Sequence, residues 1–250
     1  MLKIKEEYNK RREEIYYMIH DAYMDKCILE YIERINKLVE RGERHFESNS
    51  KHVMQHMIYL TISDLVLNIC KICHDKERNN APKKTEKTEK TEKPEIGEKT
   101  EKTEKTEKPE IGEKTAINKM EKCLNELLKE ENLASVEVVG KNLNKYVKHI
   151  EKLAGSRNKV IAHNDLDKNE KQDIKTTDIK EMYDLLDKII DVYNQLSDIS
   201  VNGKVIKITD EELAKIEFEV SEGLRRMMSQ ACYRKTSNSL QGEDGNGSKS

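Results

Sequence analysis

The chain has 250 residues, of which 35% are hydrophobic and 38% are charged, with no Trp, two Phe and three Pro. Few residues are available to build a core, so we expect one domain made of long amphipathic helices rather than a sheet. The formal net charge of -2 excludes a protein that is basic over its whole surface, so any contact with RNA or DNA must be local.

The cellular compartment of the protein is predicted from the sequence signals that the chain lacks. No stretch approaches the roughly 18 apolar residues of a membrane span, and the charged N-terminus is unlike a secretory signal. Five cysteines form an odd set that is typical of a reducing compartment. We therefore expect a cytoplasmic protein with no membrane contact.

Two long helices are predicted in the first part of the chain. Apolar residues recur at spacings of three and four over 4–39, which indicates one long or once-broken helix. The second helix, 54–73, is the most apolar. Its predicted core positions are Met54, Met57, Ile58, Ile62, Leu65, Val66, Ile69 and Cys73.

Two short patterns near this helix have a chemical alternative. Cys70, Cys73 and His74 match the C-x-x-C-H pattern of covalent haem attachment, but attachment needs an oxidising compartment, so we favour buried thiols. His52 and His56 have the spacing of a helical zinc pair, but no Glu lies between them to act as a metalloprotease base, so we favour a surface pair. No cofactor or metal is expected.

Residues 83–115 contain a tandem duplication, because the segment TEKTEKTEKPEIGEK occurs twice without a change. Ten Lys balance ten Glu, and Ile96 and Ile111 are its only large apolar residues. Such a segment cannot bury enough apolar surface to offset its chain entropy, so we predict a disordered loop. A charged coiled coil is the alternative, but a three-residue period gives no apolar seam and the Pro and Gly residues would break it.

Four further helices are predicted after the insertion, over 117–128, 136–154, 177–196 and 210–228. Thr177 or Asp178 can cap the third of these, and Asn202 with Gly203 between valines suggests a small hairpin. The predicted fold class is therefore an all-α bundle of about five to seven helices. It forms one domain over 1–233, and the polar tail over 234–250 is predicted to be disordered.

The segment SRNKVIAHND, which begins at Ser156, places an Arg-Asn pair a few residues before a His. Gly155 is a natural helix end because glycine tolerates the left-handed conformation, and Ser156 can cap the next element. Arg157 and Asn158 are therefore expected at a helix junction. On an ideal helix Arg157 and His163 lie about 120° apart, so their cooperation requires that the turn ends early or that two chains combine.

Positive charge is concentrated around this segment. Residues 140–164 carry six Lys or Arg and one Glu, whereas 177–198 carry six acids and two Lys. A local basic face is what a phosphate backbone needs, although lysines on an amphipathic helix can also be solvated surface. The candidate RNA-binding residues are Lys141, Lys145, Lys148, Lys152 and Lys159.

The Arg-Asn pair, four residues and then His, within an all-helical domain, resembles the signature of the HEPN superfamily. The segment and its flanking helices, over about 54–196, look like the abortive-infection branch of that superfamily. The duplicated insertion departs from the family pattern. The resemblance implies a metal-independent endoribonuclease of a phage-defence or toxin-antitoxin system, which works as a homodimer and can have a neutralising antitoxin protein as partner.

The residues of the motif suit that chemistry. RNA alone carries a 2'-hydroxyl, and its attack on the adjacent phosphate needs a base and a cation. His163 can transfer the proton, Arg157 can hold the phosphate with two parallel hydrogen bonds, and Asn158 would orient either partner. The alternative is a non-catalytic helical module that dimerises and binds RNA, a nucleotide or a protein, since a junction arginine often only caps carbonyls.

Overall fold

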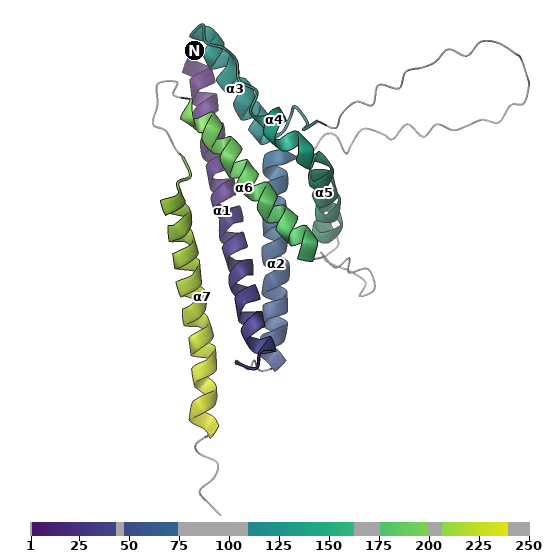
Figure 1. Ribbon diagram of the computed structural model, residues 1–250, viewed down its shortest axis with the longest axis vertical. Coiled ribbons are helices and arrows are strands. Elements are labelled where there is room, and N and C mark those ends of the chain that lie inside the picture. The colour runs from purple at the N-terminus through teal and green to yellow at the C-terminus, as the bar shows by residue number, and fades with distance from the viewer. Residues whose placement is uncertain (1, 44–47, 75–109, 163–175, 200–206, 240–250) are drawn as a thin grey trace, which may run out of the picture.

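The computed structural model describes residues 2–43, 48–74, 110–162, 176–199 and 207–239, and at 48–50, 156–162, 176–177 and 230–239 it describes the helical backbone alone. All regular elements in these ranges are helical, which confirms the predicted all-α class (Figure 1). They are α1 (Leu2–Glu40), α2 (Ser48–Cys73), α3 (Ala116–Glu130), α4 (Val139–Leu143), the 3-10 turn η2 (Asn144–Tyr146), α5 (Val147–Ala162), α6 (Thr176–Asp198) and α7 (Asp210–Ser239).

Helix α1 is the centre of the bundle. It runs without a break, and it packs against α2, α3, α6 and α7, while α5 packs against α2 (Figure 1). Tyr8, Ile15, Ala22 and Leu29 are all buried, and their spacing of seven keeps one seam of α1 directed at its neighbours. This seam explains how so few apolar residues hold a helix of this length.

Helix α2 is buried over its C-terminal half only. Five of its predicted core positions, from Ile62 to Cys73, are buried, and so is Cys70, which confirms the interpretation of the thiols as core residues. The prediction is wrong for Met54 and Met57, which are partly exposed, whereas Ile58 is also partly exposed but packs against the core. Figure 1 shows the reason. Helix α1 lies along the length of α2, whereas α5 covers only the C-terminal end of α2.

One helical stretch among the described residues, Lys51–Cys73, is long and apolar enough to cross a membrane by length and composition. Of its most apolar window, 44% is buried inside the protein. The core helix of a bundle passes the same test, so the stretch is weak evidence for a membrane span.

The predicted disordered insertion is ordered at its C-terminal end. Ile111 is buried, its backbone N–H donates to Asn144 Oδ1 at 2.9 Å, and the side chain of Asn118 donates to the carbonyl of Gly112 at 2.9 Å. Thr115 then caps α3 by accepting a hydrogen bond from the Asn118 N–H at 3.3 Å. The prediction of disorder is therefore wrong for 110–115, because one isoleucine finds a place in the core and two asparagines satisfy the backbone beside it.

The helix predicted over 136–154 is wrong at both ends. It is divided into α4, η2 and α5, and the start of α4 is held by Glu121, whose Oε1 accepts from the N–H groups of Val138 and Val139 at 2.5 and 3.0 Å. At the other end α5 passes through Gly155 and continues to Ala162. Glycine tolerates a helix interior at a cost of roughly 1 kcal/mol, which the packing of α5 on α2 can offset.

Helix α6 crosses α1 and buries a continuous apolar face (Figure 1), made of Met182, Leu185, Leu186, Ile189, Val192, Tyr193 and Leu196. It begins at Thr176, so Thr177 and Asp178 lie in its first turn and neither is its N-cap, contrary to the prediction. Asn202 and Gly203, the predicted hairpin turn, lie outside the described residues.

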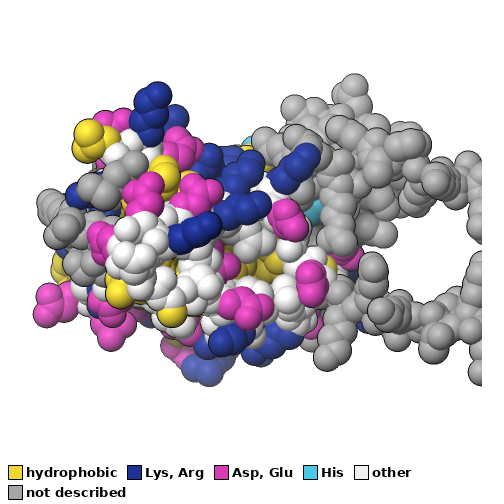
Figure 2. All heavy atoms as spheres, turned by 90° about the horizontal axis from the view of Figure 1, so that it is seen from above, with side chains coloured by type: hydrophobic (Ala, Val, Ile, Leu, Met, Phe, Trp, Pro, Cys, Tyr) yellow, Lys and Arg dark blue, Asp and Glu magenta, His cyan; other side chains and the backbone are white. Residues whose placement is uncertain are grey.

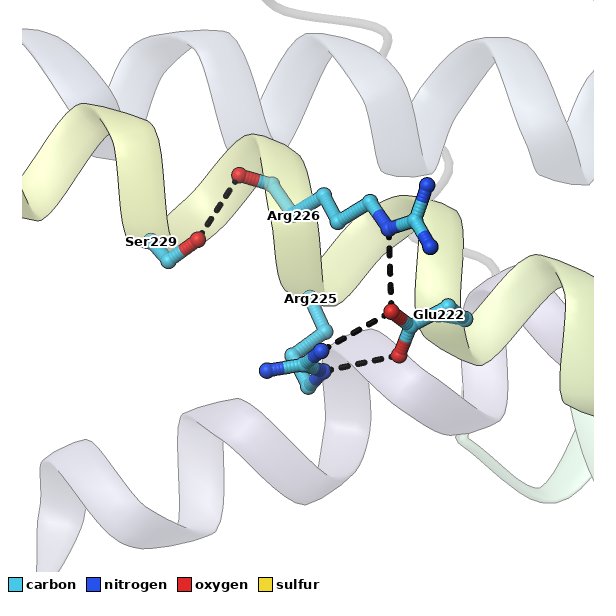
Figure 3. A network of polar contacts seen from close by, with 4 residues as sticks. All are labelled: Glu222, Arg225, Arg226 and Ser229. Atoms are coloured by element: carbon cyan, nitrogen blue, oxygen red, sulfur yellow. Dashed lines mark hydrogen bonds and ion pairs between the residues drawn. The ribbon is translucent and has the colours of Figure 1, made fainter.

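Helix α7 lies along α1 (Figure 1) and has a well-defined start. Thr209 and Glu212 form a reciprocal capping box, and Tyr16 of α1 donates to Glu212 Oε1 at 2.6 Å. Further along the exposed face of α7, Glu222 accepts from Arg225 and Arg226 (Figure 3), and these hydrogen bonds lower the pKa of Glu222 to about 2. The helix continues to Ser239, past residue 228 and into the segment predicted to be disordered, since each added residue of a helix gains a hydrogen bond.

Candidate functional site

The Arg-Asn pair lies on a regular helix and not at a junction. Arg157 and Asn158 are in the second half of α5, which continues to Ala162, and Ser156 is inside the helix and cannot be its N-cap. The side chains of Arg157 and Asn158 and the whole of His163 lie outside what the structure describes. The structure therefore fixes the backbone position of the pair and leaves its relation to His163 as a prediction.

The first half of α5 is anchored by its apolar side. Val147, Ile150, Leu153 and Ala154 are buried, and α5 packs against α2 through this part of the bundle. All four residues precede Gly155 in the chain. The described anchoring of α5 therefore comes from the part of the helix that precedes Arg157.

Two polar bridges connect the same half of α5 to α6. His149 Nδ1 lies 2.8 Å from Glu181 Oε2, and Lys152 Nζ lies 2.6 Å from Asp178 Oδ1. The hydrogen bond to Asp178 raises the pKa of Lys152 above its ordinary value, because it stabilises the charged ammonium. Helix α5 is thus held by α2 on one side and by α6 on another.

The candidate lysines do not form one continuous helix face. Lys141 is on α4, Lys145 is on η2, and only Lys148 and Lys152 share the described part of α5. The ammonium of Lys145 lies 4.9 Å from the centroid of the Tyr146 ring, and that of Lys152 is paired with a carboxylate. Lys141 and Lys148 are exposed, and the side chain of Lys159 lies outside the described residues.

The surface seen from the end of the bundle carries both signs of charge. In Figure 2 the Lys and Arg side chains are interspersed with Asp and Glu, and no large field of one sign is visible on that face. This agrees with the net charge of -2. The basic residues near α5 are therefore a local feature of a surface of mixed charge.

His149 is the residue of this region that the sequence did not identify. It is one of seven histidines, and its side chain is only 11% exposed. The sequence does contain a signal, because His149 and Lys152 are three residues apart and so are Asp178 and Glu181, as two antiparallel helices require for two bridges. Without the arrangement of α5 and α6 that pattern cannot be distinguished from others in so charged a chain.

Among the described residues, no group of three or more His, Cys, Asp or Glu side chains could hold a metal ion. What this part of the chain presents is an all-α bundle in which one firmly anchored helix carries an Arg-Asn pair near its end. That architecture is an all-α bundle, the fold class that the resemblance to the HEPN superfamily implied.

Comparison with known families defines the protein further. The model of the AbiU2 family, an abortive-infection-associated branch of the HEPN superfamily, matches residues 1–204. The chain therefore belongs to the AbiU2 family. Comparisons with curated proteins and with solved structures find no match. Helix α7 lies C-terminal to the matched residues.

Proposed function

We propose that this protein is a metal-independent endoribonuclease of a phage-defence or toxin-antitoxin system. The observation that carries the proposal is the Arg-Asn pair on α5 with His163 following the helix, in a chain of the AbiU2 family. Two features of the structure support it. The helix that carries Arg157 is anchored on two sides, and the lysines Lys141 and Lys148 beside it are exposed.

The proposed reaction is an internal transfer at one phosphate of RNA. His163 takes the proton of a 2'-hydroxyl, and the 2'-oxygen forms a bond to phosphorus. The bond to the 5'-oxygen of the next nucleotide breaks, and that oxygen takes the proton from the protonated His163. Arg157 stabilises the charge that builds on the phosphoryl oxygens, since a guanidinium can donate two parallel hydrogen bonds. The products are a cyclic phosphate and a 5'-hydroxyl, so no water and no metal enters this step.

The proposed active form is a homodimer. Arg157 lies on a regular helix, and if that helix continued by one residue, His163 would point about 120° away from it. A two-fold axis places the same segment of both subunits face to face, so that Arg157 of one subunit can meet His163 of the other. Lys141 and Lys148 would then border a shared groove for the RNA backbone.

The test is cleavage of a defined RNA by purified protein, with and without a chelator. His163→Ala and Arg157→Lys should each lose at least about 100-fold in rate, because one removes the proton carrier and the other the planar donor pair. His20→Ala on α1 and Arg226→Lys on α7 are the matched controls, and they should cleave as the wild type does. Cleavage that a chelator abolishes, or that survives in His163→Ala, would contradict the mechanism.

A growth assay separates this proposal from a binding module. A nuclease should arrest growth on expression, and His163→Ala should relieve the arrest. Equal tolerance of the wild type and of His163→Ala would favour a non-catalytic module that binds RNA, a nucleotide or a partner protein.

A further inference from the structure

The two bridges between α5 and α6 lie one turn apart on both helices. His149 pairs with Glu181, and Lys152 pairs with Asp178, so the bridges run in opposite chain directions as they do between antiparallel helices. In each bridge one partner is largely buried and the other is exposed. The exposed fractions are 11% for His149 and 17% for Asp178, against 59% for Glu181 and 60% for Lys152. Pairs with one buried partner hold a defined geometry better than fully exposed pairs do.

These bridges are polar links between α5 and α6 among the described side chains, and the buried apolar residues of the two helices belong to one core cluster. Apolar contacts are non-directional, so without the bridges they would restrain a tilt of α5 toward or away from α6 less closely. Arg157 lies about 12 Å along the helix axis from His149, at 1.5 Å per residue, so a tilt of about 10° would displace its backbone by about 2 Å. Displacements of about 1 Å at a catalytic group can cost about 100-fold in rate.

We infer that His149 and Lys152 are positioning residues, which set the direction of α5 through Glu181 and Asp178 and so place Arg157 at the scissile phosphate. The consequence for catalysis rests on the proposed function, whereas the consequence for the helix does not. Lys152 thereby has a role other than the RNA contact that the sequence suggested.

The two partners of one bridge distinguish positioning from RNA binding. If Lys152 positions α5, then Lys152→Met and Asp178→Ala remove the same link, and both should lower kcat about 10-fold or more with KM nearly unchanged. The double variant should be no worse than the more affected single one. If Lys152 binds RNA instead, the two variants should differ in sign, because Lys152→Met would raise KM and Asp178→Ala would free the ammonium and lower KM. That second pattern would overturn the inference.

The other bridge permits rescue by a conservative change. Glu181→Ala should lower kcat, and Glu181→Gln should restore most of it, because an amide oxygen can still accept a hydrogen bond from His149 Nδ1. Lys188→Met is the matched control, since Lys188 pairs with Asp191 at 2.7 Å but within α6, and it should leave kcat as it is.

Hydrogen exchange tests the inference without relying on activity. Asp178→Ala and Glu181→Ala should speed the exchange of the backbone amides of residues 155–162, while Lys188→Met should not. If the wild type cleaves no RNA, the proposed function fails and the exchange result alone decides the inference. Exchange that stays at the wild-type rate in both bridge variants would overturn it.

Discussion

Gly155 lies in the interior of α5, and a Cβ placed on it would meet no atom within 4 Å. Alanine at such a position reduces the entropy lost on folding, so Gly155→Ala should raise the free energy of unfolding by roughly 0.5–1 kcal/mol. Gly223 of α7 also lies inside a helix, and a Cβ placed on it would also meet no atom within 4 Å. Gly223→Ala is therefore the control for the effect of an alanine in an open helical position. Thermal unfolding of both variants checks this, and a decrease for Gly155→Ala would show that the backbone there is not regular helix.

The same pair of variants reports on the site. If RNA approaches the backbone of α5 at Gly155, the added methyl group should slow cleavage in Gly155→Ala and leave Gly223→Ala at the wild-type rate. Equal rates in the two variants would show that RNA does not approach the backbone closely at Gly155.

Asp25 of α1 faces other carboxylates. Burial, Asp64 of α2 and Asp21 of α1 together raise the pKa of Asp25 from 3.8 to about 7. A carboxyl group with a raised pKa in the folded state binds its proton more tightly there than in the unfolded chain. The folded state is therefore favoured at low pH, and this contribution is lost as the pH rises toward and through 7.

It follows that Asp25→Asn should raise the melting temperature at pH 8 and leave it nearly unchanged at pH 4. Melting curves of the variant and the wild type across this range provide the measurement. Asp21→Asn, on the exposed side of α1, should show a smaller effect at pH 8. A difference that grew toward low pH would contradict the assignment.

At the scale of single elements, the two copies of the repeat offer a matched pair of isoleucines. Ile111 is buried and its backbone is held by Asn144, whereas Ile96 is in the stretch that we predict to be solvated. Ile111→Ala should lower the free energy of unfolding by about 2 kcal/mol or more, because it leaves a cavity, and Ile96→Ala should have no measurable effect. Chemical denaturation of both variants measures the difference. Equal effects would mean that the copies are structurally equivalent.

How far the elements could be predicted depended on their partners. The periodic apolar pattern was sufficient for α1, α3 and α6, because a seam along a helix is recorded in its own sequence. It failed at Met54 and Met57 in the first half of α2, where apolar residues recur beside α1 but stay exposed or only half-buried. It also failed at Gly155, since a glycine marks a helix end or a tolerated interior position according to packing that the sequence does not show.

The candidate site could also be predicted only in part. The spacing of Arg157 and His163 is local and was visible directly. The bridges of His149 and Lys152 depend on acids that follow 32 and 26 positions later, and these distances in sequence have no meaning until α5 and α6 are placed. For the same reason the lysines could be counted beforehand, but their separation onto α4, η2 and α5 could not be predicted.

At the scale of the whole molecule, a composite site of two subunits makes a quantitative prediction. Arg157→Ala and His163→Ala should each be inactive as homodimers. After mixing with subunit exchange, half of the dimers combine the two variants, and each of these has one intact site, so about a quarter of the wild-type activity should return. Activity assays after co-refolding provide the measurement. No recovery in a mixture shown to contain mixed dimers would place both groups in the same subunit.

The ordered C-terminal end of the repeat, residues 110–114, allows the number of copies to change. Deleting residues 85–99 and deleting residues 100–114 produce one and the same protein, because the two copies are identical. Either way a PEIGEK segment remains directly before the threonine that caps α3, so an isoleucine stays available for the core. If the rest of the insertion is the loop that its composition predicts, the deletion only shortens it. The closure entropy then changes by about 0.6 kcal/mol per halving, and the melting temperature of the deletion variant should hardly move. One copy before Thr115 is enough to supply the buried isoleucine, so adding or removing further whole copies should change the length of the protein and leave its helices as they are.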